Sequence, residues 1–174
     1  LATNFRPFLK HLGRQDLIDA LKLAALPKRH GIVPMLDDAD ENAVALACCN
    51  RLVPARDAAI TLLALTTGMR ACDIVNLKLE DIDWRAATVT IIQQKTGNPL
   101  TVPLAPALLE ALAEYVLEHR PDSEFPNVFV RAKAPHVPYR DHAAIYAATA
   151  RTLRAAGAEG GGTLLTRHNA ASKM

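Results

Sequence analysis

This sequence has few aromatic residues, few cysteines and no long hydrophobic run. Only 5% of the 174 residues are aromatic, and Cys48, Cys49 and Cys72 lack the spacing of a zinc site or a disulfide framework. We interpret these cysteines as small buried side chains. No apolar run approaches the ~20 residues that a membrane-spanning helix needs, and no signal peptide opens the chain. These absences favour a cytoplasmic protein that does not enter a membrane.

Half of the residues are hydrophobic, which is enough for one real core. Alanine and leucine dominate, and this composition favours helices packed through small aliphatic side chains. Two runs rich in β-branched residues, 88–94 and 100–104, flank a glycine-containing loop and predict a β-hairpin. We expect residues 127–131 to form a third short strand. The sequence therefore predicts a mainly α fold with a small three-stranded antiparallel sheet.

The spacing of apolar residues also places the helices. We predict helices at residues 16–26, 38–50, 55–67, 106–119 and 141–156, and a final helix beginning near Thr163. Asp38 and Glu41 resemble a capping box at the start of the second of these. Pro54 is expected in the first turn of the third, which should be buried because it is apolar nearly all round.

The formal net charge of +2 says little, but the distribution of charge is uneven. Residues 1–30 carry six Lys or Arg against two Asp or Glu, and residues 127–174 carry seven against two. Residues 31–126 carry seven against fourteen. Two basic ends around an acidic middle could form the basic face of a DNA-binding protein or ordinary solvated surface, and charge alone does not decide between them.

The segment with the clearest chemistry surrounds Arg70. Gly68 ends the helix that we expect to be buried, and Arg70 stands at the start of the next helical turn. An arginine held at the edge of a core, near helix N-terminal N–H groups, suits the binding of an anion. Asp73 follows three residues later on the same helical face and can orient Arg70. The alternative, which spacing alone favours, is a surface ion pair worth ~0.2–0.5 kcal/mol.

This segment, TGMRACDIVNLKLEDIDW, resembles the first signature box of the tyrosine recombinases, the phage integrase family. Lys95 lies in the predicted hairpin loop, where the family carries its catalytic lysine. The helix at 106–119 and the strand at 127–131 follow in the family's order, and Arg167-His168 matches the Arg-His core of the second box. Each motif is weak by itself, but the ordered set is specific. The resemblance extends from about residue 34 to the end.

The resemblance implies a DNA breaking-rejoining fold and its chemistry. Arg70 and Arg167 would bind the nonbridging oxygens of a DNA phosphate, where negative charge builds up during attack. Lys95 would act as the general acid that protonates the leaving 5′-hydroxyl. Asp73 would support Arg70. No metal or other cofactor is implied, because the arginines supply the electrostatic stabilisation.

The second box departs from the family pattern at one position. The family usually has a histidine three residues before its second arginine, and here that position is Leu164. Leucine can neither contact a phosphate nor transfer a proton. His168 lies on a different side of the helix from that position, and we interpret it as a supporting residue that packs or forms a hydrogen bond.

A second departure concerns the nucleophile. The family's tyrosine follows the second box by some tens of residues, and this sequence stops at Met174. All three tyrosines precede Arg167, and we interpret each as a packing residue: Tyr115, Tyr139 and Tyr146. We therefore expect this chain not to cleave DNA by itself.

The family also suggests partners and a domain organisation. Thr96, Arg140 and His142 are candidate contacts to double-stranded DNA, although solvated surface is an equally good interpretation of each. Arg151 and Arg154 should face solvent or a partner subunit. Family members act as homotetramers on two DNA sites, while a monomer is left open for this chain. Residues 1–33 resemble the tail of a core-binding domain and a linker, and residues 34–174 a C-terminally incomplete catalytic domain.

Two functions are therefore open. The first is site-specific DNA recombination or integration through a 3′-phosphotyrosine intermediate, by a bacterial or phage-encoded enzyme of the nucleoid. The second is a catalytically inactive DNA-binding or regulatory relative, which Leu164 and the missing tyrosine favour. A type IB topoisomerase shares the chemistry but normally has a longer and different sequence context.

Overall fold

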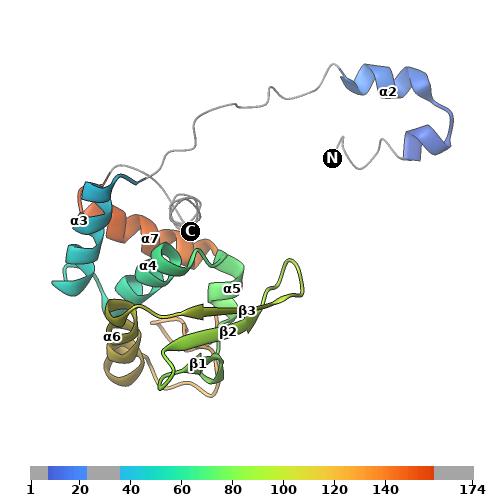
Figure 1. Cartoon of the computed structure of the whole chain (residues 1–174). Coiled ribbons are helices and arrows are strands. Elements are labelled where there is room, and N and C mark those ends of the chain that lie inside the picture. Colours follow the sequence, from blue (N-terminus) through green and yellow to red (C-terminus); the bar gives the residue numbers. More distant parts are fainter. Residues whose placement is uncertain (1–7, 23–35, 159–174) are drawn as a thin grey trace. The chain divides into compact units, whose positions relative to one another are not determined.

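The computed structural model describes residues 8–22 and 36–158, and the chain divides into two compact units, Leu1–Ile32 and Val33–Met174 (Figure 1). In the first unit, residues 8–11 are helical and α2 spans Gln15–Lys22. The guanidinium of Arg14, directly before that helix, donates to both carboxylate oxygens of Asp16 in its first turn, at 2.9 and 2.7 Å. The predicted helix at 16–26 is therefore present, beginning one residue earlier, and its end lies outside the described residues.

The second unit combines helices with one small sheet. Its described elements are α3 (Asp38–Cys49), α4 (Ala55–Thr67), α5 (Ala71–Asn76), η1 (Leu79–Asp81), β1 (Ile82–Asp83), β2 (Thr88–Ile92), β3 (Pro99–Pro103), α6 (Pro106–Glu114), η2 (Tyr115–His119) and α7 (Ala143–Ala155). The predicted fold class, mainly α with a three-stranded antiparallel sheet, is confirmed. Within the described residues, no helix has the length and apolar content that crossing a membrane requires.

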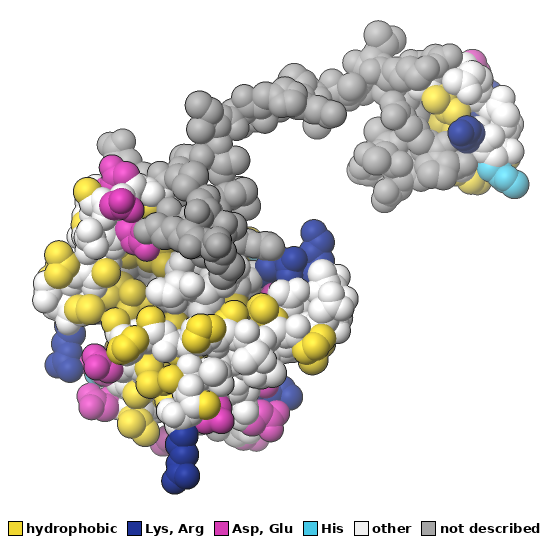
Figure 2. Space-filling model, in the orientation of Figure 1, with side chains coloured by type: hydrophobic (Ala, Val, Ile, Leu, Met, Phe, Trp, Pro, Cys, Tyr) yellow, Lys and Arg dark blue, Asp and Glu magenta, His cyan; other side chains and the backbone are white. Residues whose placement is uncertain are grey.

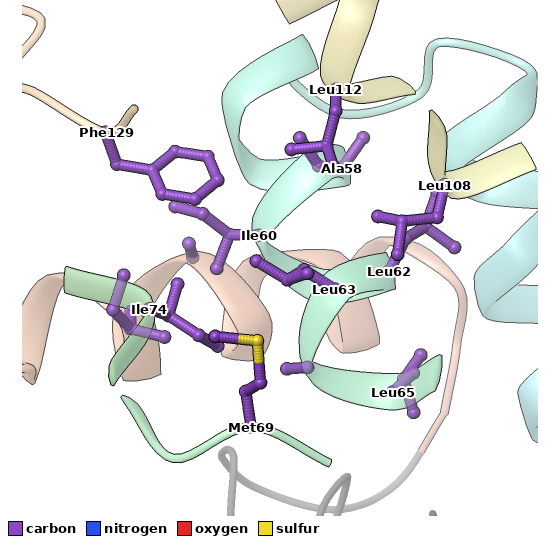
Figure 3. Packing of buried hydrophobic residues seen from close by; sticks show 14 of the residues in the cluster. Ala58, Ile60, Leu62, Leu63, Leu65, Met69, Ile74, Leu108, Leu112 and Phe129 are labelled. Atoms are coloured by element: carbon purple, nitrogen blue, oxygen red, sulfur yellow. The ribbon is translucent and has the colours of Figure 1, made fainter. Parts of the chain in front are cut away.

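Helix α4 is the centre of the core and packs against α3, α5, α6 and α7. Ten of its 13 residues are buried, as its apolar sequence predicts. Figure 3 shows Ile60 facing Phe129, and Leu62 facing Leu108 of α6. Pro54 was expected in the first turn of α4 but lies just before it, as the N-cap. Its carbonyl accepts hydrogen bonds from the N–H groups of Asp57 and Ala58.

Helix α3 begins at Asp38 as predicted, but its cap is a different residue. The side chain of Asp37 accepts a hydrogen bond from the N–H of Asp40 at 2.7 Å, so Asp37 is the N-cap and the Asp38–Glu41 capping box was wrong. Figure 2 shows acidic side chains gathered at this end of α3. Negative charge at a helix N-terminus is stabilising because it faces the positive end of the helix dipole.

The sheet has the order β1–β2–β3, and both pairs are antiparallel. Val89 pairs with Val102 on the buried face, and Thr90 pairs with Thr101 on the exposed face, where their hydroxyls lie 2.9 Å apart. The predicted hairpin is therefore confirmed. This alternation fixes the register of β2 and β3, because a slip of one residue would turn the valine of the slipped strand to the solvent.

The predicted third strand at 127–131 was wrong, and β1 takes its place in the sheet. Asn127 forms an isolated bridge with Lys78, and Val130 forms another with Pro138. Val128, Phe129 and Val130 are all buried, so the segment lacks the alternation of a sheet with one solvated face. Pro138 has no N–H to extend a ladder, so the pairing stops after one residue.

The predicted helix at 106–119 changes its winding near the middle. It begins as α6 and continues from Tyr115 as the π-helical turn η2. Leu108, Leu112 and Tyr115 turn towards the core. The guanidinium of Arg120, directly after η2, donates to the carbonyls of Phe125 and Asn127 at 2.8 and 2.9 Å. These hydrogen bonds hold the following loop against the end of the helix.

Candidate active site

Arg70 is fixed by the ends of two helices. Helix α4 ends at Gly68, whose left-handed conformation (φ +62°) favours glycine and lets its N–H bond to the carbonyl of Ala64 at 3.2 Å. Met69 is buried and ties the connection to the core. Arg70 is then the N-cap of α5, and its carbonyl accepts hydrogen bonds from the N–H groups of Asp73 and Ile74. The backbone of Arg70 is therefore rigidly placed at the edge of the core, as the sequence predicts.

Arg70 and Asp73 form an ion pair that is largely shielded from solvent. Arg70 Nη1 lies 4.0 Å from Asp73 Oδ2, and the two side chains are 20% and 1% exposed. The alternative of a solvated surface pair is therefore wrong. Among the described residues, neither Arg70 Nε nor Asp73 Oδ2 has a hydrogen-bond partner. Both of these atoms are buried, but the Arg70 side chain as a whole stays 20% exposed, so part of it is open to an anion such as a phosphate.

The other oxygen of Asp73 contacts the β2–β3 hairpin. Asp73 Oδ1 accepts a hydrogen bond from the backbone N–H of Gln94 at 2.8 Å, although the two residues are 21 positions apart. The thiol of Cys72 also lies 3.8 Å from this oxygen. Sequence analysis missed this contact, because any residue except proline offers a backbone N–H and no pattern marks this one. The contact joins α5 to the segment that carries Lys95.

Lys95 lies in the turn between β2 and β3, as predicted, and is exposed. The turn is closed by hydrogen bonds from Gln93 N–H to the Asn98 carbonyl (2.9 Å) and from Gly97 N–H to the Gln93 carbonyl (2.8 Å). Gly97 has a φ of +70°, which explains glycine at this position. Figure 2 shows Lys or Arg side chains beside the end of this hairpin. The structure confirms where Lys95 lies, and its catalytic role stays a prediction.

The three predicted DNA contacts lie on two elements. Thr96 is next to Lys95, and its hydroxyl donates to the Gln93 side chain at 2.7 Å. Arg140 and His142 are exposed just before α7, and the ring of His142 lies edge-on to that of Tyr146 at 5.0 Å. Helix α7 packs against α4 and α5. These residues are accessible, and their contacts with DNA stay predictions.

The second predicted box lies beyond the part of the chain that the structure describes. Arg167 and His168, like Leu164, belong to residues 159–174, whose structure is not described. The role of Arg167 as the second phosphate-binding arginine and that of His168 as a supporting residue remain predictions, as does any consequence of having Leu164 where the family has a histidine.

Arg151 was expected to face solvent or a partner subunit, but it contacts a buried residue of α4. Its Nε donates to Oδ2 of the fully buried Asp57 at 2.7 Å, and this bond raises the pKa of Arg151. Arg56 contacts the other oxygen of Asp57 at 3.0 Å. This Arg56–Asp57–Arg151 clamp joins α4, which leads to Arg70, to α7, which begins after Arg140 and His142. Arg154 is exposed, as expected.

Two of the three tyrosines pack as expected. Tyr115 is 1% exposed and stacks on Phe129 with ring centres 5.4 Å apart, and burial raises its pKa to about 12. Burial also raises the pKa of the partly buried Tyr139. Tyr146 is exposed and contacts His142 instead of the core, so the packing interpretation was wrong there. Tyr115 is shielded and Tyr139 is partly buried, and the raised pKa of each disfavours the phenolate that attack on a phosphate would use.

The cysteines differ from one another in exposure. Cys48 is buried, as expected, and burial raises its pKa to about 12. Cys49 is exposed and Cys72 is partly exposed, so the interpretation of all three as buried was wrong. The adjacent positions of Cys48 and Cys49 place their side chains about 100° apart around α3, and only one of them can face the core.

One group of possible metal ligands occurs in the described residues, at positions that are distant from Arg70 in the sequence. The ligand atoms of Glu114, Glu118 and His119 are within 4.8 Å of one another at the junction of α6 and η2. Glu114 is already paired with Arg51 at 2.9 Å and lies 3.7 Å from His119 Nε2. Such ion pairs account for the grouping, so we assign no metal to it.

Comparison with known proteins agrees with this geometry. The phage integrase family model matches residues 35–174. Integrase/recombinase y4gC of Sinorhizobium fredii is 36% identical over 128 residues, which cover 72% of this chain and 65% of that protein. The chain therefore spans just under two thirds of the length of this relative.

Solved structures share the fold at low sequence identity. The XerA recombinase crystal structure superposes with a TM-score of 0.70 at 22% identity, covering 82% of this chain and 51% of that one. A lambda integrase dimer bound to a COC′ core site gives 0.66 at 17% identity, covering 98% and 63%. Because the family match includes most of the sequence, the chain belongs to the phage integrase family, and residues 36–158 have the fold of a tyrosine recombinase catalytic domain.

Proposed function

We propose that this chain supplies the phosphate-binding and proton-donating part of a site-specific recombinase. The observation that carries the proposal is the shielded Arg70–Asp73 pair, whose aspartate also contacts the turn that carries Lys95. A fixed guanidinium that is joined through Asp73 to the turn carrying a lysine suits a reaction in which a phosphodiester gains negative charge and loses an alcohol. Membership of the phage integrase family supports the same reaction.

In the proposed reaction, a tyrosine attacks the DNA phosphate and forms a 3′-phosphotyrosine bond while the bond to the 5′-oxygen breaks. Arg70, together with Arg167, binds the nonbridging oxygens and stabilises the charge that develops on them. Lys95 gives its proton to the leaving 5′-oxygen. Because Tyr115 is buried, Tyr139 is partly buried and Tyr146, like both of them, precedes Arg167 in the sequence, we propose that none of these three is the nucleophile and that this chain does not cleave DNA by itself.

We further propose that the partner is double-stranded DNA and that the whole protein works as a homotetramer on two sites. The solved relatives include a lambda integrase dimer bound to a core site and a tetramer bound to a Holliday junction. The exposure of Thr96, Arg140 and His142 supports contacts with the DNA backbone. A monomer is left open for this chain alone, and the place of action would be the bacterial nucleoid.

A covalent-trapping experiment tests the proposal on the protein that the whole gene encodes. The substrate is a nicked duplex of its selected binding site, from which a short strand diffuses away after cleavage and prevents rejoining. We expect a covalent protein–DNA adduct that Arg70→Ala reduces by about 10²- to 10³-fold, as removal of one charge-stabilising donor does. Arg85→Ala, which removes an exposed arginine from the β1–β2 turn, is the matched control and should leave the adduct unchanged.

The role of Lys95 is tested by changing the leaving group. A substrate with sulfur in place of the 5′-oxygen leaves as a thiolate, which needs little protonation because thiols have a pKa of about 8.5. Lys95→Ala should therefore be slow on the normal substrate and recover on the sulfur substrate. Absence of an adduct on every selected site would overturn the enzymatic proposal and favour the DNA-binding relative.

A further inference from the structure

The carboxylate of Asp73 contacts two parts of the proposed site at once. Its Oδ2 faces Arg70, and its Oδ1 accepts a hydrogen bond from the backbone N–H of Gln94, the residue directly before Lys95. We propose that Asp73 is a positioning residue for Lys95, because it fixes the turn that carries the lysine relative to Arg70. The catalytic consequence rests on the proposed function, whereas the anchor itself does not.

The other hydrogen bonds of this turn are internal to it. Gln93 and Asn98 pair through their backbones, Gly97 donates to Gln93, and the Thr96 hydroxyl bonds to the Gln93 side chain. These bonds fix the shape of the turn but not its place against α5. Among the described residues, the bond from Gln94 to Asp73 is the hydrogen bond that joins this turn to another element.

The burial of Asp73 makes this bond an effective anchor. The side chain is 1% exposed, and a charged acceptor in such surroundings forms a short and strong hydrogen bond. The turn lies beyond the last ladder pair of the sheet, Ile92 and Pro99, so pairing between the strands does not hold it against α5. A fixed carboxylate at the base of the turn therefore limits the positions that Lys95 can reach.

Hydrogen exchange measures the anchor directly, with no need for activity. In this chain, Asp73→Ala should speed exchange of the Gln94 amide by about ten- to a hundredfold, as loss of a hydrogen bond to a charged group does. Asp73→Asn should largely preserve protection, because the amide oxygen of asparagine can still accept this bond. The Gly97 amide, bonded within the same turn, is the internal control and should keep its rate. Equal acceleration at Gly97, or none at Gln94, would overturn the proposal.

The two variants also separate the two partners of Asp73 in the cleavage reaction. Asp73→Ala loses the anchor of Lys95, so part of its defect should recover on the 5′-sulfur substrate, which needs little proton transfer. Asp73→Asn keeps the anchor but places an NH₂ group beside Arg70, so its defect should not recover. If the sulfur substrate rescues neither variant, Asp73 acts only through Arg70 and the proposal is wrong.

These results distinguish failure of this proposal from failure of the proposed function. If the protein of the whole gene forms no adduct, the recombinase function fails, whereas the exchange rates still test the anchor. If an adduct forms but Gln94 exchanges at the same rate in wild type and Asp73→Ala, the function stands and the anchor is wrong.

Discussion

The Arg56–Asp57–Arg151 clamp should contribute strongly to stability. Asp57 is 0% exposed, and Arg56 and Arg151 contact separate oxygens of its carboxylate at 3.0 and 2.7 Å. In Asp57→Ala, both guanidinium groups lose their buried partner. Breaking a buried ion pair in this way typically costs about 3–5 kcal/mol. Because the arginine side chains are 22% and 47% exposed and can be rehydrated, we expect the lower end, about 3 kcal/mol.

Removal of one arginine should cost less. In Arg151→Ala, Asp57 keeps Arg56, and the loss is that of one hydrogen bond to a charged group, about 1.5–3 kcal/mol. The double variant should be less destabilised than the sum of the single ones, since the two residues share one interaction. The difference between the double variant and the sum of the two single variants gives the coupling free energy between Asp57 of α4 and Arg151 of α7.

Urea unfolding near neutral pH, followed by circular dichroism, measures these differences. With a slope of about 2 kcal/mol per molar urea, Asp57→Ala should lower the midpoint by roughly 1.5 M. Asp122→Ala, which removes an exposed carboxylate, should leave the midpoint nearly unchanged. A loss below about 1 kcal/mol for Asp57→Ala, or losses that add without coupling, would refute the reasoning.

Two further predictions concern a buried phenol and a turn. The pKa of Tyr115 is raised from 10.0 to about 12, so the unfolded chain releases this proton first and the free energy of unfolding should fall as pH rises through that interval. Tyr115→Phe should reduce that fall, measured by urea unfolding at several alkaline pH values, and an unchanged fall would contradict the assignment. Gly97→Ala should cost about 1–2 kcal/mol of stability, because φ is +70° although the space around a Cβ there is open. Gly97→Asn, with a residue that tolerates this conformation, should cost less, and equal losses would mean that backbone conformation is not the cause.

Several elements follow directly from local sequence patterns. A run between Pro54 and Gly68 with apolar residues nearly all round predicts the buried helix α4, because only a central position can cover all of its faces. Alternating residues around a glycine-containing turn predict the β2–β3 hairpin. The position of Arg70 at the edge of the core is also a local prediction, because Arg70 follows the end of one helix and stands at the start of the next.

Other features depend on contacts between distant segments. Strand β1 has only two residues, too few for a recognisable alternation. The sequence therefore predicts residues 127–131 as the third strand, although these residues form only isolated bridges. Helical periodicity shows which side of α7 carries Arg151 but not that a buried Asp57 lies opposite. The bond between Asp73 and Gln94 involves a backbone donor and leaves no mark in the sequence.

The central claim is that Arg70 binds a DNA phosphate, and the salt dependence of DNA binding tests it most directly. Affinity of this chain for a short duplex can be measured by fluorescence anisotropy between about 50 and 200 mM salt. Each phosphate contact contributes about 0.9 to the slope of log affinity against log salt. We predict that Arg70→Ala weakens binding and makes the slope shallower by about 0.9, whereas Arg85→Ala changes neither. An Arg70→Ala slope equal to that of the wild type would contradict the claim.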